Sequence, residues 1–188
     1  MFRAECKAGT ELGKMASAIM SAGGLITDDI TNAIVVSRIS QPDCANGFLL
    51  DGYPRTVPQA QYLAGLLRDR RLPLPVVIHL DAPEEALVAR LTARRQCPAC
   101  KRIYNLLSQP PRVEGRCDDD GAALISRADD REATIRERLR AYNELTNPIL
   151  GWYGEEMVRR VDAGQPPDTV GKDVERMVLE ASQPAGTE

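Results

Sequence analysis

Residues 47–59 read Gly47-Phe-Leu-Leu-Asp-Gly-Tyr-Pro-Arg-Thr-Val-Pro-Gln59, and this stretch decides the fold that the sequence predicts. Its first four residues are continuously apolar, which favours a strand covered on both faces in a parallel sheet. The run ends at Asp51-Gly52, and open α/β sheets hold ligands at the carboxyl ends of their strands. Arg55 supplies a bidentate phosphate donor, and Pro58 favours the first turn of a helix. The stretch therefore predicts a buried strand, a phosphate-facing turn and a helix.

Outside this stretch, the apolar pattern alternates between helical and strand periodicity. Residues 75–80, which precede Asp81, predict a second buried strand, and residues 157–161 predict a weaker one. Thr10 and Thr27 are expected to cap helices, and Gly23-Gly24 to end the first of them. Alternating strands and helices predict a parallel α/β sheet with right-handed crossovers. The predicted helices cover residues 11–22, 28–39, 58–70, 83–94 and 130–145, a segment that opens at 147, and residues 167–179; residues 182–188 are expected to form a loose tail.

The composition bounds the class of protein. A chain of 188 residues with 43% apolar and 4% aromatic residues suits one globular domain with a small insertion. It shows no run of eighteen apolar residues and no secretory leader, and its net charge of −3 gives no case for binding polyanions. We therefore expect a cytoplasmic monomer with no nucleic-acid or membrane partner. The 20 arginines against 4 lysines fit either phosphate recognition or a compositional bias of the genome.

Three of the five cysteines predict a metal site within an insertion that covers about residues 96–126. Cys97-Pro-Ala-Cys100 is followed by Cys117-Asp-Asp-Asp120, so two pairs of candidate ligands each enclose two residues, as in a structural zinc ribbon. Three thiolates and the Asp120 carboxylate would complete a tetrahedron around Zn²⁺ and leave no open position for catalysis. The alternative is a flexible loop with incidental cysteines. The other two cysteines, Cys6 and Cys44, are expected to be inert thiols.

These motifs resemble those of adenylate kinases, which transfer a phosphoryl group between ATP and AMP. Residues 47–59 are similar to the family signature, and the insertion is similar to the zinc-bearing lid of the family's long forms. The resemblance as a whole covers the chain from Met1 to about Leu179. The resemblance implies an α/β fold of the P-loop-kinase type, with a three-layer parallel sheet whose first strands are missing and a small zinc-ribbon lid. It implies AMP-binding helices at 1–40, a core at 41–94 and 128–188, and a lid at 95–127. The lid motifs are Arg94-Arg-Gln-Cys-Pro-x-Cys100, Tyr104-Asn105, Pro110-Pro111, Val113-Glu-Gly115 and Arg127-Ala-Asp-Asp130.

The resemblance also implies an AMP site near the signature. Arg3 and Arg55 would clamp the AMP phosphate, and Gln59 would hydrogen-bond the adenine, which Gly52 allows to approach closely. Asp51 would hold the water shell of the Mg²⁺ that accompanies ATP or order the phosphate turn.

The remaining implied roles belong to arginines around the lid. Arg90 and Arg94, which are four residues apart and so expected on one helix face, would meet the base and phosphates of ATP. Arg127 and Arg138 would close over the transferred phosphoryl group together with the lid. Phosphoryl transfer needs such converging positive charge and little covalent chemistry from the protein. Each arginine taken alone also fits a solvated surface charge.

No Gly-x-x-x-x-Gly-Lys-Ser/Thr run occurs in the 188 residues, although the family binds the ATP phosphates with one. One interpretation is an incomplete product of a full adenylate kinase, for instance a reading frame begun at an internal methionine. The other is a zinc-stabilised, non-catalytic relative that binds AMP or regulates. We favour the first because every later functional position is retained, and we expect little or no turnover from this polypeptide. Another nucleoside monophosphate kinase is the alternative within the enzyme class.

Overall fold

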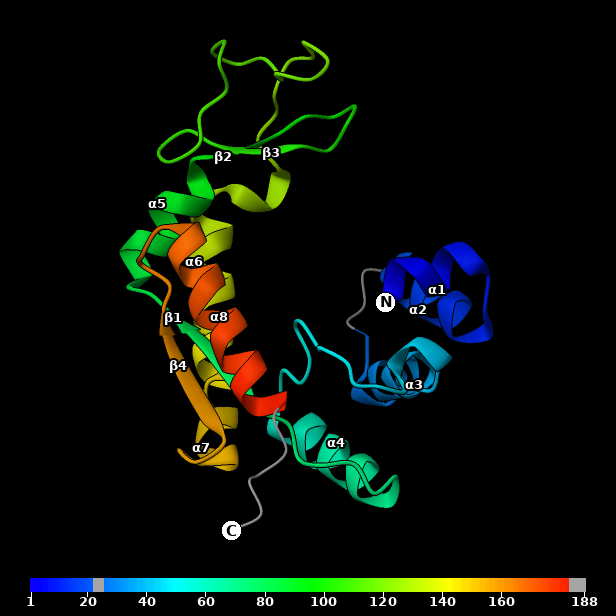
Figure 1. Ribbon diagram of the computed structural model, residues 1–188. Helices are drawn as coiled ribbons and strands as arrows, with labels where there is room; N and C mark the ends of the chain where they lie inside the picture. Colours follow the sequence, from blue (N-terminus) through cyan, green and yellow to red (C-terminus); the bar gives the residue numbers. More distant parts are fainter. Residues whose placement is uncertain (22–25, 183–188) are drawn as a thin grey trace. The chain divides into compact units, whose positions relative to one another are not determined.

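The computed structural model describes residues 1–21 and 26–182, and for Phe2, Arg3, Met20 and Ser182 it describes the backbone alone. The chain divides into two compact units, Met1–Leu74 (unit 1) and Pro75–Glu188 (unit 2). Each unit is described by itself below, with the element labels of Figure 1.

Unit 1 is helical. Thr10 caps the second helix as predicted, because its Oγ1 accepts a hydrogen bond from the Gly13 N–H at 3.0 Å. A Cβ at Gly13 would lie 2.2 Å from the carbonyl oxygen of Glu5, so only glycine lets the first two helices approach this closely. The predicted end of the second helix at Gly23-Gly24 lies outside the described residues. The helices of unit 1 are α1 (Phe2–Ala8), α2 (Glu11–Ser21), α3 (Asp28–Ile39), the 3₁₀-helix η1 (Pro42–Cys44) and α4 (Val57–Asp69).

Two apolar clusters hold these helices together. Ala16 of α2 packs with Ile30 and Ile34 of α3, and all three are buried. The second cluster joins α3 to α4 through buried residues, and the partly buried Phe48 and Leu50 pack against it. Its buried members are Val35, Ile39, Tyr53, Leu63 and Leu67. Thr27 stands at the N-cap of α3 as expected, but its side chain makes no capping hydrogen bond.

The strand predicted at residues 47–50 is wrong. The segment carries no strand assignment, and Leu49 is 72% exposed. A strand exists only where a neighbour completes its ladder of hydrogen bonds. Among the residues that the structure describes, no strand pairs with this segment. Phe48 and Leu50 instead pack against the cluster that joins α3 to α4.

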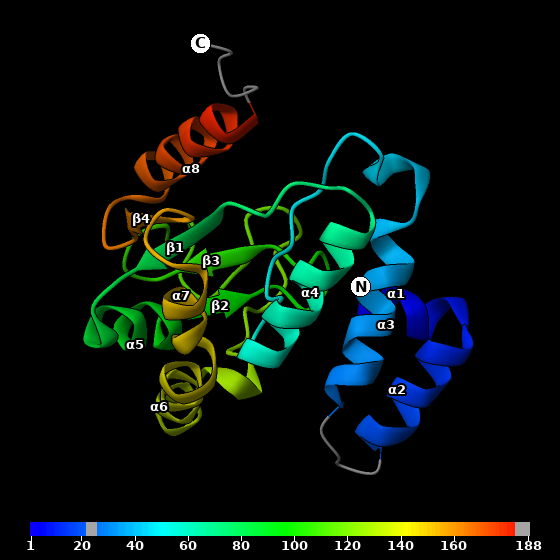
Figure 2. The same cartoon turned by 90° about the horizontal axis from the view of Figure 1, so that it is seen from below.

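Unit 2 holds a parallel pair of strands between layers of helix (Figures 1 and 2). β1 (Val77–Asp81) pairs with β4 (Val158–Asp162) in parallel, so that Asp81 and Asp162 end adjacent strands in register. α8 (Pro167–Ser182) lies on one side of this pair, and three helices lie on the other, as Figure 2 shows. Those three are α5 (Glu84–Thr92), α6 (Glu132–Ala141) and α7 (Pro148–Tyr153). The predicted α/β fold with parallel strands and flanking helices is thus confirmed.

Two details of unit 2 differ from the sequence prediction. β1 is not fully buried, since Leu80 is 53% exposed. Among the described residues, β4 pairs with one edge of β1 and no strand pairs with the other. The single helix predicted at 130–145 is three segments: a 3₁₀-helix η2 (Ala128–Asp130), α6, and a π-helical turn η3 (Tyr142–Thr146). Asp130 is buried in an ion pair with Arg94, and Arg131 after it is extended, so α6 begins at Glu132. No described helix has the length and apolar character needed to span a membrane.

Candidate functional site

The predicted phosphate turn of unit 1 is built around the Gly52 backbone. Gly52 adopts φ 75°, a left-handed conformation that glycine enters without strain. The Arg55 Nε donates to the Gly52 carbonyl oxygen at 2.8 Å, and a Cβ at residue 52 would lie 3.0 Å from the Arg55 guanidinium. Glycine therefore leaves room for the guanidinium to fold back over the turn. Asp51 beside it is exposed.

Gln59 fastens the same turn to α3 and α4. Its Oε1 accepts from the Arg55 backbone N–H at 2.7 Å, and its Nε2 donates to Asp28 at 2.6 Å. Thr56 caps α4 by accepting from the Gln59 N–H and also donates to Asp28 at 3.1 Å. Gln59 is buried, so its amide serves the protein's own contacts in this structure. The structure thus brings Gly52, Arg55 and Gln59 together; Arg3 lies in α1, with its side chain outside what the structure describes.

Three of the four predicted arginines of unit 2 meet at one short segment, Arg127–Asp130. The guanidinium of Arg94 forms a two-pronged ion pair with the buried carboxylate of Asp130. Arg138 of α6 pairs with Asp129 at 3.3 Å. Arg127 opens the segment and donates from Nε to the Gln96 side chain at 2.8 Å. These three cations, drawn from β2 (Arg94–Gln96), a loop and α6, therefore lie close to two carboxylates, Asp129 and Asp130.

Arg90 lies apart from that group. It sits in the last turn of α5 and donates to the Ala163 carbonyl oxygen at 3.2 Å. The prediction that Arg90 and Arg94 share a helix face is wrong, because α5 ends at Thr92 and Arg94 begins the strand β2 (Arg94–Gln96). The helix stops where Arg95 donates to the Thr92 carbonyl oxygen and Arg94 starts a ladder with β3 (Ile103–Asn105).

The pKa values of both partners are shifted by the ion pair between Asp130 and Arg94. The hydrogen bonds from Arg94 are the main cause that holds the pKa of the Asp130 carboxyl below its usual range, against the opposing effect of burial. The same contact raises the pKa of Arg94. Both groups are therefore charged at neutral pH, which is the state in which Arg94 can bind phosphate.

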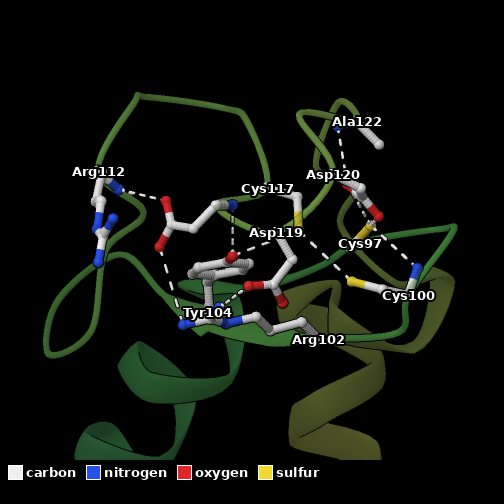
Figure 3. Close-up of polar contacts among 10 residues, drawn as sticks. Cys97, Cys100, Arg102, Tyr104, Arg112, Cys117, Asp119, Asp120 and Ala122 are labelled. Carbon is white, nitrogen blue, oxygen red and sulfur yellow. Dashed lines mark hydrogen bonds and ion pairs between the residues drawn. The ribbon is translucent and has the colours of Figure 1, made fainter.

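The predicted metal ligands also come together. One ligand atom from each of Cys97, Cys100, Cys117 and Asp120 lies within 4.8 Å of every other. The Sγ atoms of Cys100 and Cys117 are 3.5 Å apart, and a carboxylate oxygen of Asp120 lies 3.2 Å from the Cys97 Sγ (Figure 3). Zn–S bonds of about 2.3 Å in a tetrahedron place two sulfur atoms roughly 3.8 Å apart, so this cluster has about the size of a zinc site.

Two matching turns, which we call knuckle 1 (residues 97–102) and knuckle 2 (residues 117–122), present these ligands. In each, the first cysteine donates its backbone N–H to the carbonyl oxygen five residues on, at 2.9 Å in both. The N–H four residues on returns to that cysteine's carbonyl oxygen, at 3.1 Å in knuckle 1 and 2.9 Å in knuckle 2. Lys101 and Gly121 occupy the same left-handed position, with φ 68° and 70°. The two pairs of ligands are therefore held by equivalent backbone geometry.

The donor set fits a structural Zn²⁺. Three sulfur ligands and one carboxylate suit a borderline soft ion, and four protein ligands complete its usual coordination. A hydrogen bond from the Ala122 backbone N–H at 3.0 Å is the main cause that lowers the pKa of Asp120 to about 2, so this ligand is ionised as metal binding requires. Cys6 and Cys44 lie in unit 1, outside the cluster.

Several residues that support these sites were not predicted from the sequence as such. Asp28 was assigned no role at the turn, yet it binds Thr56 and Gln59, about thirty residues away. Asp130 is 36 residues from its partner Arg94. Tyr104 is buried against Cys117, with its Oη 3.4 Å from the Sγ. In the sequence, the signals for these contacts were weak: the acidic pair Asp129-Asp130 at the start of the predicted charged helix, and the aromatic Tyr104 close to the first pair of ligands.

Comparison with known proteins gives a consistent result. A family model described as adenylate kinase matches residues 1–158. An adenylate kinase of Anaeromyxobacter dehalogenans is 49% identical over 153 residues, which are 81% of this chain and 72% of the relative. One from Oceanobacillus iheyensis is 45% identical over 179 residues, which are 95% and 83% of the two chains. One from Thermotoga maritima is 45% identical over 168 residues, which are 89% and 74%.

The family model spans parts of both units, including the turn at Gly52 and the cysteines of knuckles 1 and 2. It rests on close identity over most of the chain, and the site residues lie in the conformations described above. The chain therefore belongs to the adenylate kinase family of phosphotransferase enzymes.

Proposed function

We propose that the chain serves the reversible transfer of a phosphoryl group from ATP to AMP, giving two ADP, with Mg²⁺ bound to ATP. The observation that carries this proposal is the 45–49% identity to relatives named adenylate kinase over most of the chain. The grouping of Arg94, Arg127 and Arg138 at one segment supports it, since phosphoryl transfer depends on convergent positive charge. In this structure Asp129 and Asp130 pair with two of these cations.

The individual roles follow the same proposal. Residues 1–40 would form the AMP-binding helices, residues 41–94 and 128–188 the core, and residues 95–127 the zinc-binding lid. The charged state of Arg94 and the open exposure of Asp51 support roles at phosphate and at the magnesium's water shell. The proposed AMP site comprises Arg3, Gly52, Arg55 and Gln59; the ATP site comprises Arg90 and Arg94; and Asp51, Arg94, Arg127 and Arg138 serve the transfer.

The 188-residue polypeptide itself is proposed to have little or no turnover. It contains no Gly-rich loop with Lys and Ser/Thr to cradle the ATP phosphates. Arg94, Arg127 and Arg138 are already engaged with Asp130, Gln96 and Asp129, so they do not substitute for a cradle of backbone amides. A zinc-stabilised AMP-binding or regulatory protein is the alternative function, and a nucleoside monophosphate kinase of other base specificity is the alternative enzyme.

We also propose that Cys97, Cys100, Cys117 and Asp120 hold one structural Zn²⁺, which the size and chemistry of the cluster support. The protein is proposed to act as a cytoplasmic monomer on free nucleotides and not on nucleic acid or membranes. The net charge of −3 is consistent with that proposal.

AMP binding by unit 1 tests the substrate assignment. We expect calorimetry to detect weak binding of AMP to the chain, because Arg55 is held at the turn by the Gly52 carbonyl oxygen. Arg55→Ala should lower the affinity at least tenfold by removing a charge-assisted phosphate contact of roughly 1.5–3 kcal/mol. Arg68→Ala, which removes an arginine in the last turn of α4, away from the turn at Gly52, is the matched control and should bind AMP like the parent chain. Equal affinity of the Arg55 variant would contradict the AMP site, and preference for another nucleoside monophosphate would favour the alternative enzyme.

A further inference from the structure

Tyr104 contacts the proposed metal site without being one of its ligands. It is 3% exposed, and its Oη lies 3.4 Å from the Cys117 Sγ (Figure 3). The same oxygen accepts a hydrogen bond of 2.7 Å from the Asp118 backbone N–H. The hydroxyl therefore stands between a ligand sulfur and the backbone of knuckle 2.

The direction of the bond between Tyr104 and Cys117 follows from its partners. The Asp118 backbone N–H can only donate, so it occupies an acceptor position of the hydroxyl. A metal-bound cysteine is a thiolate without a proton, so it can only accept. The one proton of the Tyr104 hydroxyl is then directed to the Cys117 sulfur when the metal is bound.

The surrounding contacts hold the ring in this place. The Arg102 guanidinium lies over the Tyr104 ring, 5.1 Å from its centroid, and pairs with Asp119 on knuckle 2. The Asp118 carboxylate accepts from the Arg112 backbone N–H at 2.8 Å and so links the loop that precedes knuckle 2 to these contacts. Figure 3 shows these residues forming one continuous set of contacts beside the cluster. Arg102 over the ring and the Asp118 backbone N–H at the hydroxyl thus hold Tyr104 with its Oη beside the Cys117 sulfur.

The net charge of the metal-bound cluster indicates what the hydrogen bond from Tyr104 contributes. Zn²⁺ with three thiolates and one carboxylate carries a net charge of −2, and Cys97 and Cys117 are buried. A buried charge is costly unless hydrogen bonds compensate it. We propose that Tyr104 is a positioning residue of the metal site, whose hydroxyl donates to the Cys117 thiolate, orients it and offsets part of its charge. This inference rests on the proposed zinc site.

The experiment compares the parent chain with Tyr104→Phe, which keeps the ring and removes only the hydroxyl. Tyr62→Phe on the exposed surface of α4 is the matched control, and Cys100→Ser is the loss-of-ligand control. Zinc affinity is measured by competition with a chelator, and the Co²⁺-substituted proteins are compared by their thiolate-to-cobalt charge-transfer bands. Removal of a hydrogen bond to sulfur raises the energy of its donor electrons, so the band should move to longer wavelength.

We expect Tyr104→Phe to bind zinc about 10–100-fold more weakly, as is usual when a residue supporting a ligand is lost, and to shift the cobalt band. Tyr62→Phe should match the parent. Unchanged affinity and spectrum in Tyr104→Phe would overturn the inference and leave the zinc site intact. Weaker binding with an unshifted band would also overturn it, because the hydroxyl would then act only on folding. If the parent chain binds no more zinc than Cys100→Ser, both the metal site and this inference fail.

Discussion

Asp130 shows how a single residue organises the cationic group of unit 2. Its side chain is fully buried and meets Arg94, whose own side chain stays 22% exposed. A carboxylate in that position both neutralises and orients the guanidinium, while one side of the guanidinium remains accessible. Asp129, which pairs with Arg138, is about half exposed and makes a weaker contribution.

Replacing Asp130 by Asn should lower the free energy of unfolding by roughly 1.5–3 kcal/mol at pH 7, because Arg94 loses its charged partner. The pKa of Asp130 is lower in the folded chain than when unfolded. Its contribution is therefore complete above the unfolded pKa of about 3.9 and is lost as the pH falls through the lower folded pKa. The difference between parent and variant should be constant above about pH 5 and shrink in acid.

Urea unfolding followed by the fluorescence of Trp152, the single tryptophan, measures this difference in unit 2. Asp129→Asn is the matched control and should change the unfolding free energy by less than about 1 kcal/mol. A difference for Asp130→Asn that persists unchanged to pH 2 would argue against the charge as its cause.

For single residues, contacts within one short turn could be predicted from the sequence, and contacts between residues far apart in the chain could not. The four metal ligands follow from the repeated spacing of two residues, which is a property of one short turn. The partner of Arg94 could not be predicted in this way, because 36 residues separate it from Asp130 and only the fold brings them together. The same holds for Gln59 and Asp28.

Among the elements, the helices were predicted best because their signals are local. The cap at Thr10 and the proline in the first turn of α4 fall where expected. The run at 47–50 has the composition of a buried strand, yet pairing decides whether a strand forms, and composition does not report the partner. The end of α5 before Arg94 was missed because the ladder with β3 competes with helix continuation.

The two knuckles allow a test at the scale of the element. Gly121 has φ 70°, and a Cβ there would meet no atom within 4 Å, so Gly121→Ala adds backbone strain without a clash. That strain is about 1 kcal/mol, which corresponds to roughly fivefold weaker zinc binding if the lid folds around its metal. The lid is expected to fold in this way because small ribbons depend on their ion.

Lys101→Gly at the equivalent position of knuckle 1 is the control. It relieves the left-handed strain of Lys101 but adds freedom to the unfolded chain, so zinc affinity should change by less than about threefold. Chelator competition measures both variants. Equal zinc affinity of Gly121→Ala and the parent would show that the knuckles do not fold around the metal.

On the scale of the whole molecule, family membership was predicted from motifs and is confirmed by the comparisons. The fold class was likewise predicted, with a parallel strand pair flanked by helices in unit 2 and helices in unit 1. The polypeptide of 188 residues carries the turn at Gly52 and the four candidate metal ligands without a Gly-rich phosphate loop, and we claim that it therefore has little or no turnover.

Formation of ADP from ATP and AMP by the chain, purified from a host that lacks its own adenylate kinase, tests that claim most directly. Removing even one preorganised donor to a reacting group typically raises the barrier by about 2.7–4 kcal/mol, a loss of roughly 10²–10³ in rate. A whole cradle of amides and its lysine should matter more. We predict no ADP formation above the background of a preparation without the protein; robust turnover by this polypeptide would contradict the account.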